Sequence, residues 1–262
     1  MATKTEIKKW IKEILQPVIK PYGYKTGMEK KYTGAFGIYK ETPEYFDYFL
    51  IDIYRDKTVQ LSIFDTINKI SNKKLVEITG IEKIEYATLM QFPETDPYYA
   101  MSKQKDFSYE VPIQIKPQLQ TYLQPLIDNF ANNVKLVNHY RYIPNLLKKW
   151  EEVEKIYEQT GNYEIRNSYF PSPYKYFHIY FFYRILNYME SDDFYKKVVE
   201  HYEDTIKKYR KKKHHLESTY VENLNNFKKL KTYFDTLSPE ELAQLKEEFK
   251  PFLTPPKEES PV

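Results

Sequence analysis

The sequence predicts an α+β protein, in which an N-terminal helix and a mostly antiparallel sheet are followed by an all-helical C-terminal half with long helices. A helical repeat of apolar residues opens the chain, and several stretches up to residue 113 alternate between apolar and polar residues. No Gly or Pro occurs between Pro173 and Pro239, which permits long helices. The pattern changes near Pro117, so we expect an α+β domain at residues 1–113, a helical domain at 114–253 and a disordered tail at 254–262.

The first expected element is an amphipathic helix. Thr3 and Glu6 have the spacing of a capping box, in which each side chain accepts a hydrogen bond from the other residue's backbone N–H. Pro21 and Gly23 end the helix. Its apolar face is formed by Ile7, Trp10, Ile11, Ile14, Leu15, Val18 and Ile19.

Strands are expected next, at residues 35–40, 45–55 and 58–64. The last two are joined by a short polar link and should pair as a hairpin. The sequence pattern of residues 66–78 is compatible with a helix or a strand, and a helix is favoured. Residues 83–92 and 107–113 are further strand candidates, separated by a loop at 93–105.

The C-terminal half should contain long helices, starting with residues 118–134 and 144–159. A loop is expected at 163–173, followed by a helix after Pro173 and a helix capped by Ser191. Thr219 and Glu222 form another capping-box pattern, so the chain should turn near His215. A last helix begins at Ser238, where a capping serine is followed by proline and two acids.

The amino-acid composition and the charge of the chain exclude several classes of function. The 40 Lys and Arg residues exceed the 37 Asp and Glu residues by three, too small an excess to predict nucleic-acid binding by itself. There is no Cys, which excludes disulfides, thiolate nucleophiles and Cys-ligated zinc. The N-terminal segment lacks the apolar core of a signal peptide. The most apolar run, residues 176–189, is too short and too polar to span a bilayer. We therefore expect a soluble cytoplasmic protein with no membrane insertion.

Catalytic and metal-binding patterns are weak. Asp47 and Asp52 have opposite parity on one expected strand and therefore point to opposite faces of the sheet. No pair of His residues has the spacing of a zinc protease, and His178 fits a packed, hydrogen-bonded ring. We expect no metal and no cofactor. Arg210 and His215 resemble the Arg-x4-His signature of HEPN ribonucleases, which would imply action on an RNA phosphate. A solvated basic helix end explains the same residues.

Two surfaces are candidates for binding. The basic run could bind phosphates without sequence preference, although a solvated helix face explains it too; it consists of Lys207, Lys208, Arg210, Lys211, Lys212 and Lys213. The aromatic segment 169–188 predicts a helix that is buried in the core or against a partner. For a partner protein, the contact residues would be Tyr176, Tyr180, Tyr183 and Arg184. This requires them to face solvent in the monomer.

The N-terminal third resembles an uncharacterised family of small bacterial α+β domains sometimes found beside toxin genes. The resemblance is carried by the helix at residues 7–19, by Pro21-Tyr22-Gly23-Tyr24-Lys25, and by strands ending in Val59-Gln60-Leu61-Ser62. It implies a non-enzymatic role in binding another protein, such as neutralising a toxin. The sequence therefore favours an immunity-type protein-binding function, with nucleic-acid binding through residues 207–213 and a HEPN-like ribonuclease as alternatives. Oligomeric state is open.

Overall fold

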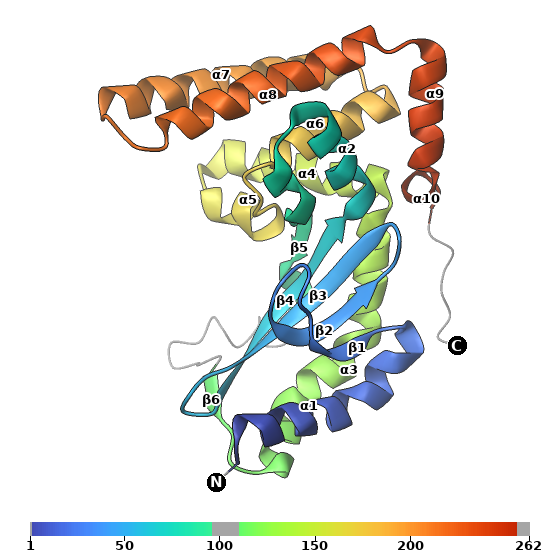
Figure 1. The fold of residues 1–262 in the computed structure, drawn as a ribbon, viewed down its shortest axis with the longest axis vertical. Helices are drawn as coiled ribbons and strands as arrows, with labels where there is room; N and C mark the ends of the chain where they lie inside the picture. Colours follow the sequence, from blue (N-terminus) through green and yellow to red (C-terminus); the bar gives the residue numbers. More distant parts are fainter. Residues whose placement is uncertain (1, 96–109, 256–262) are drawn as a thin grey trace. The chain divides into compact units, whose positions relative to one another are not determined.

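The computed structural model describes residues 2–95 and 110–255. Contacts divide the chain into two compact units. The first is formed by the described parts of residues 1–68, 88–171 and 255–262, and the second by Lys69–Ala87 and Ser172–Thr254. The predicted fold class is confirmed, because an N-terminal helix is followed by an antiparallel sheet and then by a helical C-terminal half (Figure 1).

The first unit contains an antiparallel sheet with the strand order β1-β2-β3-β4-β5. A further strand, β6, also pairs with β4, at the opposite end from β5. The strands are β1 (Lys25–Met28), β2 (Phe36–Glu41), β3 (Tyr45–Ile53), β4 (Thr58–Asn68), β5 (Met90–Phe92) and β6 (Glu110–Pro112). The predicted hairpin between the second and third of the expected strands is confirmed as β3–β4.

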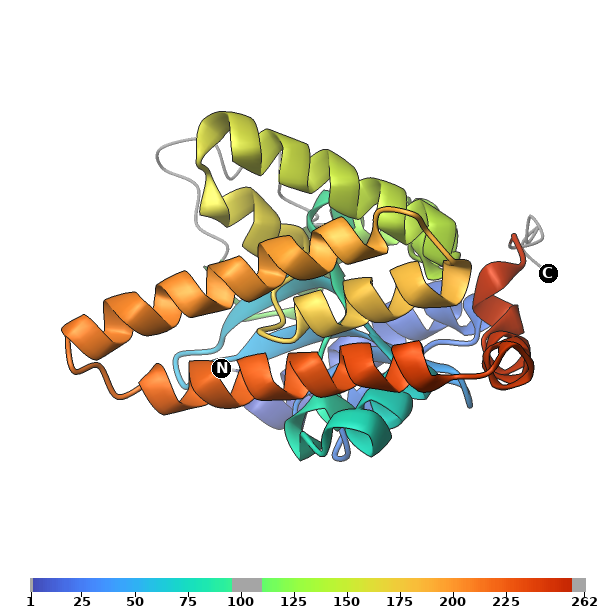
Figure 2. The same cartoon turned by 90° about the horizontal axis from the view of Figure 1, so that it is seen from above.

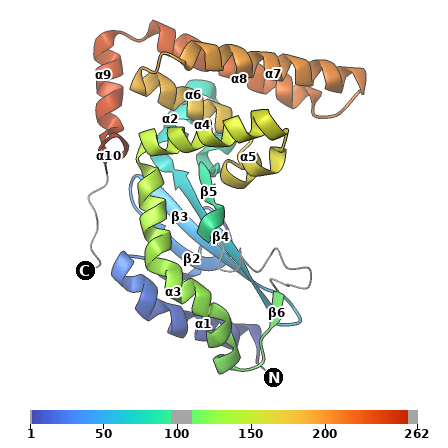
Figure 3. The ribbon, with the colours of Figure 1, turned by 180° about the vertical axis from the view of Figure 1, so that it is seen from behind.

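Helices α1 and α3 pack against each other in this unit (Figure 3). Its helices are α1 (Lys4–Ile19), the 3-10 turns η1 (Lys20–Tyr22) and η3 (Pro93–Thr95), α3 (Lys116–Arg141), α4 (Ile143–Thr160) and α5 (Tyr163–Tyr169). The capping box of Thr3 and Glu6 is present, as predicted. Ile7, Ile11 and Leu15 repeat at helical spacing and are buried, so one face of α1 belongs to the core.

Aromatic rings join α3 to the sheet. The ring of Phe130 on α3 lies 5.5 Å from that of Tyr24 and 5.8 Å from that of Phe64 on β4, measured between centroids. All three residues are buried. Because neighbouring residues of a strand point to opposite faces, Thr66 shares the α3-facing side with Phe64, and Asp65 lies on the other side.

The sheet requires a glycine at position 37 of β2. A β-carbon at Gly37 would lie 2.2 Å from the backbone oxygen of Phe49 on β3. The close approach occurs where the β3–β4 register shifts between Phe49 and Ile51. There the backbone N–H of Leu50 donates to Ser62 Oγ at 2.7 Å instead of to a strand carbonyl. The bulge and the glycine therefore depend on each other.

The second unit is helical. It contains α2 (Lys69–Thr79), the 3-10 helix η2 (Glu82–Tyr86), α6 (Lys175–Leu186), α7 (Ser191–Lys211), α8 (Glu217–Thr236), α9 (Pro239–Glu248) and α10 (Lys250–Leu253). Helices α7 and α8 form a long antiparallel hairpin, and α6 lies against both (Figure 2). One end of the hairpin extends beyond α6 (Figure 2). Buried rings of α6 pack on α8 and on the residue after α9, where the Phe177–Phe227 and Phe181–Phe249 centroids are 5.3 and 5.2 Å apart.

The two compact units do not correspond to the predicted division at residue 113. Helices α3, α4 and α5 belong with the sheet, whereas α2 belongs with the helical unit. The periodicity of a helix reveals which of its faces is buried, but not which distant segment covers that face. The predicted tail at 254–262 lies almost entirely outside the described residues.

Several local predictions need correction. Residues 163–169 form the short helix α5, which Asn162 caps, and not a loop. Residues 82–86 form η2 and only 90–92 are a strand, so the expected strand at 83–92 is wrong over most of its length. Ser191 is the first residue of α7 and does not cap it. Helix α8 starts at Glu217 without the capping box of Thr219 and Glu222, although the turn near His215 is confirmed.

Candidate functional site

The aromatic side chains expected to contact a partner are buried. The exposed fractions of Tyr176, Tyr180 and Tyr183 are 9%, 0% and 4%. The Arg184 guanidinium donates to Tyr180 Oη at 2.9 Å and to Asp235 Oδ1 at 2.8 Å. The expectation that these residues face solvent is therefore wrong, because α7 and α8 cover the aromatic faces of α6. The other interpretation, a central core helix, describes α6 correctly.

His178 is also a core residue. Its Nε2 lies 2.7 Å from Asn72 Oδ1, and Asn72 Nδ2 donates in turn to the carbonyls of Ala87 and Glu85 at 2.9 and 3.3 Å. The other ring nitrogen, Nδ1, lies 3.1 Å from the Tyr174 carbonyl oxygen, so both ring nitrogens face oxygen acceptors. Complete burial lowers the pKa of His178 to about 4, so the ring is neutral at physiological pH. It links α6 to α2.

A buried ion pair lies on the helix-covered side of the sheet. The carboxylate of Asp47 accepts hydrogen bonds from Tyr24 Oη at 2.8 Å and Thr66 Oγ1 at 2.9 Å, and it pairs with the Arg141 guanidinium. The guanidinium stacks 3.4 Å from the centroid of the Tyr45 ring. Burial would lower the pKa of Arg141, but the Asp47 carboxylate beside it raises it. Both carboxylate oxygens are satisfied, which is typical of a structural pair.

The opposite side of the sheet buries a second acid. Asp65 is flanked by its register partners Tyr48 on β3 and Gln91 on β5. Its exposed fraction is 5%, and its Oδ1 has no hydrogen-bond partner among the described residues. Burial raises the pKa of Asp65 to about 7, although Gln91 and Tyr48 favour the charged form.

The free end of the α7–α8 hairpin concentrates positive charge. We call this end, residues 207–218, the hairpin tip. Two of its cations are paired, Lys207 with Asp204 at 3.4 Å and Arg210 with Glu217 at 2.8 Å. The others are exposed and have no ion-pair partner in the described part of the chain; they are Lys208, Lys211, Lys212 and Lys213. The basic patch read from the sequence is therefore exposed as a group.

The end of α7 positions a stack of three rings. Lys213 adopts a left-handed conformation with φ of 50°, and the N–H groups of Lys213 and His214 donate to the carbonyls of Arg210 and Tyr209. This is the Schellman ending of a helix, which brings the residue after the left-handed position onto the last turn. His214 consequently stacks on Tyr209 at 4.5 Å, and His215 stacks on His214 at 4.4 Å. His215 is exposed, so the stack ends in a ring open to solvent.

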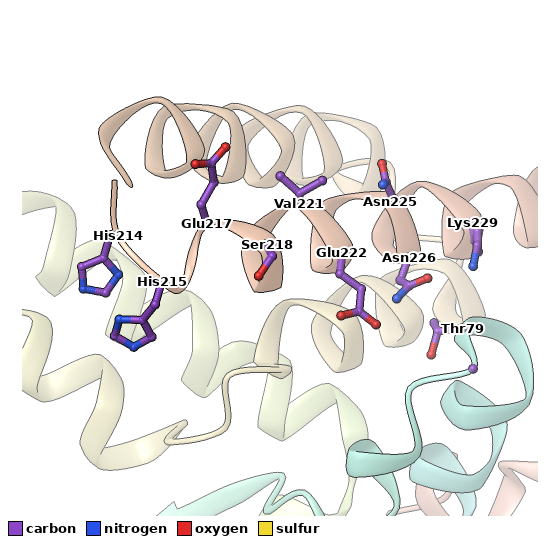
Figure 4. A pocket seen from close by; sticks show the side chains of 11 residues that line it. Thr79, His214, His215, Glu217, Ser218, Val221, Glu222, Asn225, Asn226 and Lys229 are labelled. Carbon is purple, nitrogen blue, oxygen red and sulfur yellow. The ribbon is translucent and has the colours of Figure 1, made fainter. Parts of the chain in front are cut away.

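A groove of about 820 Å³ begins at this stack and follows α8 (Figure 4). Thr79 and Gly80, which end α2, line its far part. Its long wall comes from one side of α8, at the helical spacing Ser218, Glu222, Asn225 and Lys229, together with Glu217, Val221 and Asn226. In Figure 4, Glu222, Asn226 and Lys229 project from α8 toward the side on which Thr79 lies, and His215 stands at the other end of the row.

Polar groups in this groove are left available. Asn226 has an exposed fraction of 6%, yet its side chain makes no hydrogen bond with any residue in the described ranges. Glu222, Asn225 and Lys229 likewise have no hydrogen-bond or ion-pair partner there. The amide atoms of Asn226 are not among the buried polar atoms that lack a partner, so they are open to the groove and available to a ligand there.

Arg210 and His215, the two residues of the expected ribonuclease signature, contact different partners. The Arg210 side chain pairs with Glu217, whereas His215 stacks on His214 and lines the groove. Sequence reasoning did not find Glu222, Asn225 or Asn226. A signal was present in the polar residues spaced along one side of α8, but polar residues on a helix usually indicate a solvated face.

No group of three or more His, Asp or Glu residues in the described ranges is arranged to hold a metal ion. None of the described helices is long and apolar enough to cross a membrane. No family model, curated protein or solved structure matches this chain.

Proposed function

We propose that this chain is a non-enzymatic nucleic-acid-binding protein and that its contact surface is the hairpin tip. The observation that carries the proposal is the set of four unpaired, exposed lysines beside a stack of rings that ends in solvent. Basic groups alone attract any polyanion, and open aromatic faces add contacts to bases. A cytoplasmic location, as expected from the sequence, would give access to nucleic acid.

The chemistry of the tip favours backbone contacts over base-specific reading. A lysine ammonium is a point charge, whereas the planar guanidinium of arginine binds guanine through two hydrogen bonds. The only arginine of the tip is Arg210, which is paired with Glu217. We therefore expect the contribution of the hairpin tip to affinity to depend strongly on salt and weakly on sequence.

The test is to replace Lys208, Lys211, Lys212 and Lys213 by Glu and to measure binding of a fluorescent oligonucleotide at several salt concentrations. Without these ammonium groups, binding should weaken and the slope of log affinity against log salt should fall by about 0.7 to 0.9 for each phosphate that the variant no longer neutralises. Affinity and slope equal to those of the unchanged protein would refute the proposal.

A matched control separates the tip from net charge. Replacement of Lys12, Lys20, Lys30 and Lys135 by Glu changes the charge of the chain equally, and these lysines of the first unit are exposed and have no ion-pair partner among the described residues. This variant should retain most of its affinity. Equal losses in the two variants would show that total charge matters and the tip does not.

A second candidate is the non-enzymatic, immunity-type protein-binding function, for which another protein is the expected partner. It is favoured by Leu216, an apolar side chain that is 36% exposed within the hairpin tip. Basic and apolar groups together suit an acidic partner protein. Its test is purification of the tagged chain, in which one stoichiometric protein should be retained by the unchanged chain and lost by Leu216→Asp.

A further inference from the structure

We propose that the groove along α8 binds a single strand of nucleic acid, with one base stacked on the outer face of His215 and a following base read by Asn226 and Glu222. The inference rests on the proposed function, because the hairpin tip would bring the strand to the groove. It goes further by assigning which form of nucleic acid binds and which residues contact its bases.

The ring stack provides the first contact. His214 is sandwiched between Tyr209 and His215, at centroid distances of 4.5 and 4.4 Å and interplanar angles of 21° and 23°. Only the outer face of His215 remains open at this end of the stack. A nucleobase is a flat ring that would continue the series, and such stacking tolerates every base. Bases within a duplex have both faces covered, so this contact selects a single strand.

The wall of α8 provides the second contact. The amide of Asn226 lines the groove and has no hydrogen-bond partner in the described part of the chain, so both its donor and its acceptor are available to a base edge. Asparagine amides form paired hydrogen bonds with base edges. Glu222 accepts hydrogen bonds but cannot donate when ionised, so it favours a base that carries an amino group, as cytosine does.

The charges of the groove orient the strand. The carboxylate of Glu222 would repel phosphates, so bases rather than phosphates should face this part of α8. Phosphates should lie toward the lysines of the hairpin tip at one end and toward Lys229 at the other. Helix α8 rises about 18 Å from Glu217 to Lys229, a length that suits several linked nucleotides better than one.

Fluorescence anisotropy with the full chain tests the proposal. The probes are 12-nucleotide strands of oligo(C) and oligo(U), each as RNA and as DNA, and a DNA duplex of equal length. We expect tighter binding of single strands than of duplex, and of oligo(C) than of oligo(U). His215→Ala should weaken single-strand binding about fivefold to 100-fold, the range expected when one base no longer stacks on a ring. His215→Phe, which keeps a flat ring, should restore it.

Two further variants test the α8 wall. Glu222→Gln should reduce the preference for oligo(C), and Asn226→Ala should weaken both single strands, while duplex binding changes little. Tighter binding of RNA or of DNA identifies the sugar that the groove accepts, and either result supports the proposal.

Failure takes two distinguishable forms. If the protein binds no nucleic acid in a salt-dependent manner, the proposed function fails and the inference fails with it. If single strand and duplex bind equally and His215→Ala leaves both unchanged, the proposed function stands and the assignment of the groove is overturned. His215 is exposed, so its replacement should leave the fold intact.

Discussion

The buried carboxyl of Asp65 should make the stability of the first unit depend on pH. Its pKa is raised from an ordinary 3.8 to about 7, because burial between Tyr48 and Gln91 disfavours the charged form. Between these two pH values the folded chain holds a proton that the unfolded chain releases. The free energy of unfolding should therefore fall as the pH rises from about 4 to about 7, and should not change further above that range.

The magnitude follows from the two pKa values. One pKa unit corresponds to about 1.4 kcal/mol, so the full effect amounts to ~4 kcal/mol. Asp65→Asn has nearly the same shape and no charge at any of these pH values. The variant should be more stable than the unchanged protein by only about 1 kcal/mol at pH 4.5, and by up to ~4 kcal/mol at pH 8.

Urea unfolding of both proteins at pH 4.5, 6 and 8 measures this difference. The other titrating groups contribute equally to the free energy of unfolding of both proteins, so their contributions cancel in the comparison. Asp52→Asn serves as the control, since Asp52 is an exposed residue on the adjacent strand β3. NMR titration of the Asp65 carboxyl carbon gives the pKa directly. A stability difference between Asp65→Asn and the unchanged chain that is the same at pH 4.5 and 8 would refute the reasoning.

Two more substitutions test the sheet. Gly37→Ala places a methyl group 2.2 Å from the backbone oxygen of Phe49, which cannot move aside as a flexible side chain would. We therefore expect the free energy of unfolding, measured by heat or urea, to fall by about 3 kcal/mol or more. A fall below ~1 kcal/mol would contradict the close approach. Arg141→Met leaves the Asp47 carboxylate buried without its cation and should cost about 3 to 5 kcal/mol, whereas a neutral effect would show that the pair is dispensable.

Local signals in the sequence predicted part of the local structure. The capping box of Thr3 and the cap at Ser238 each need only a few consecutive residues, and both are present, whereas the cap at Ser191 and the capping box of Thr219 and Glu222 are not. The β3–β4 hairpin follows from the alternation of two adjacent segments. Helix α5 was missed because seven residues are too few to show a clear period, and the cap at Asn162 is its main signal.

The rest depended on contacts that are distant in the sequence. The position of α2 with α6 and α8, rather than with the sheet that precedes it, is fixed by groups such as Asn72 and His178, which are 106 residues apart. The positive charge of the hairpin tip was visible in the sequence as a run of basic residues. Its ring stack was not, because Lys213 occupies a left-handed position that usually belongs to glycine. The unpaired amide of Asn226 becomes recognisable only once its surroundings are known.

The second unit is assembled from two separate stretches of chain, and this has a consequence for synthesis on the ribosome. Helix α2 is translated well before α6 and α8, so its apolar side stays uncovered until residues 88–171 and these two helices have been made. Contacts between such remote segments close large loops and form slowly. A chain that ends before Ser172 would contain the strands of the sheet and helix α2, but not the helices that cover α2. Helix α2 would then be exposed to proteases and to aggregation.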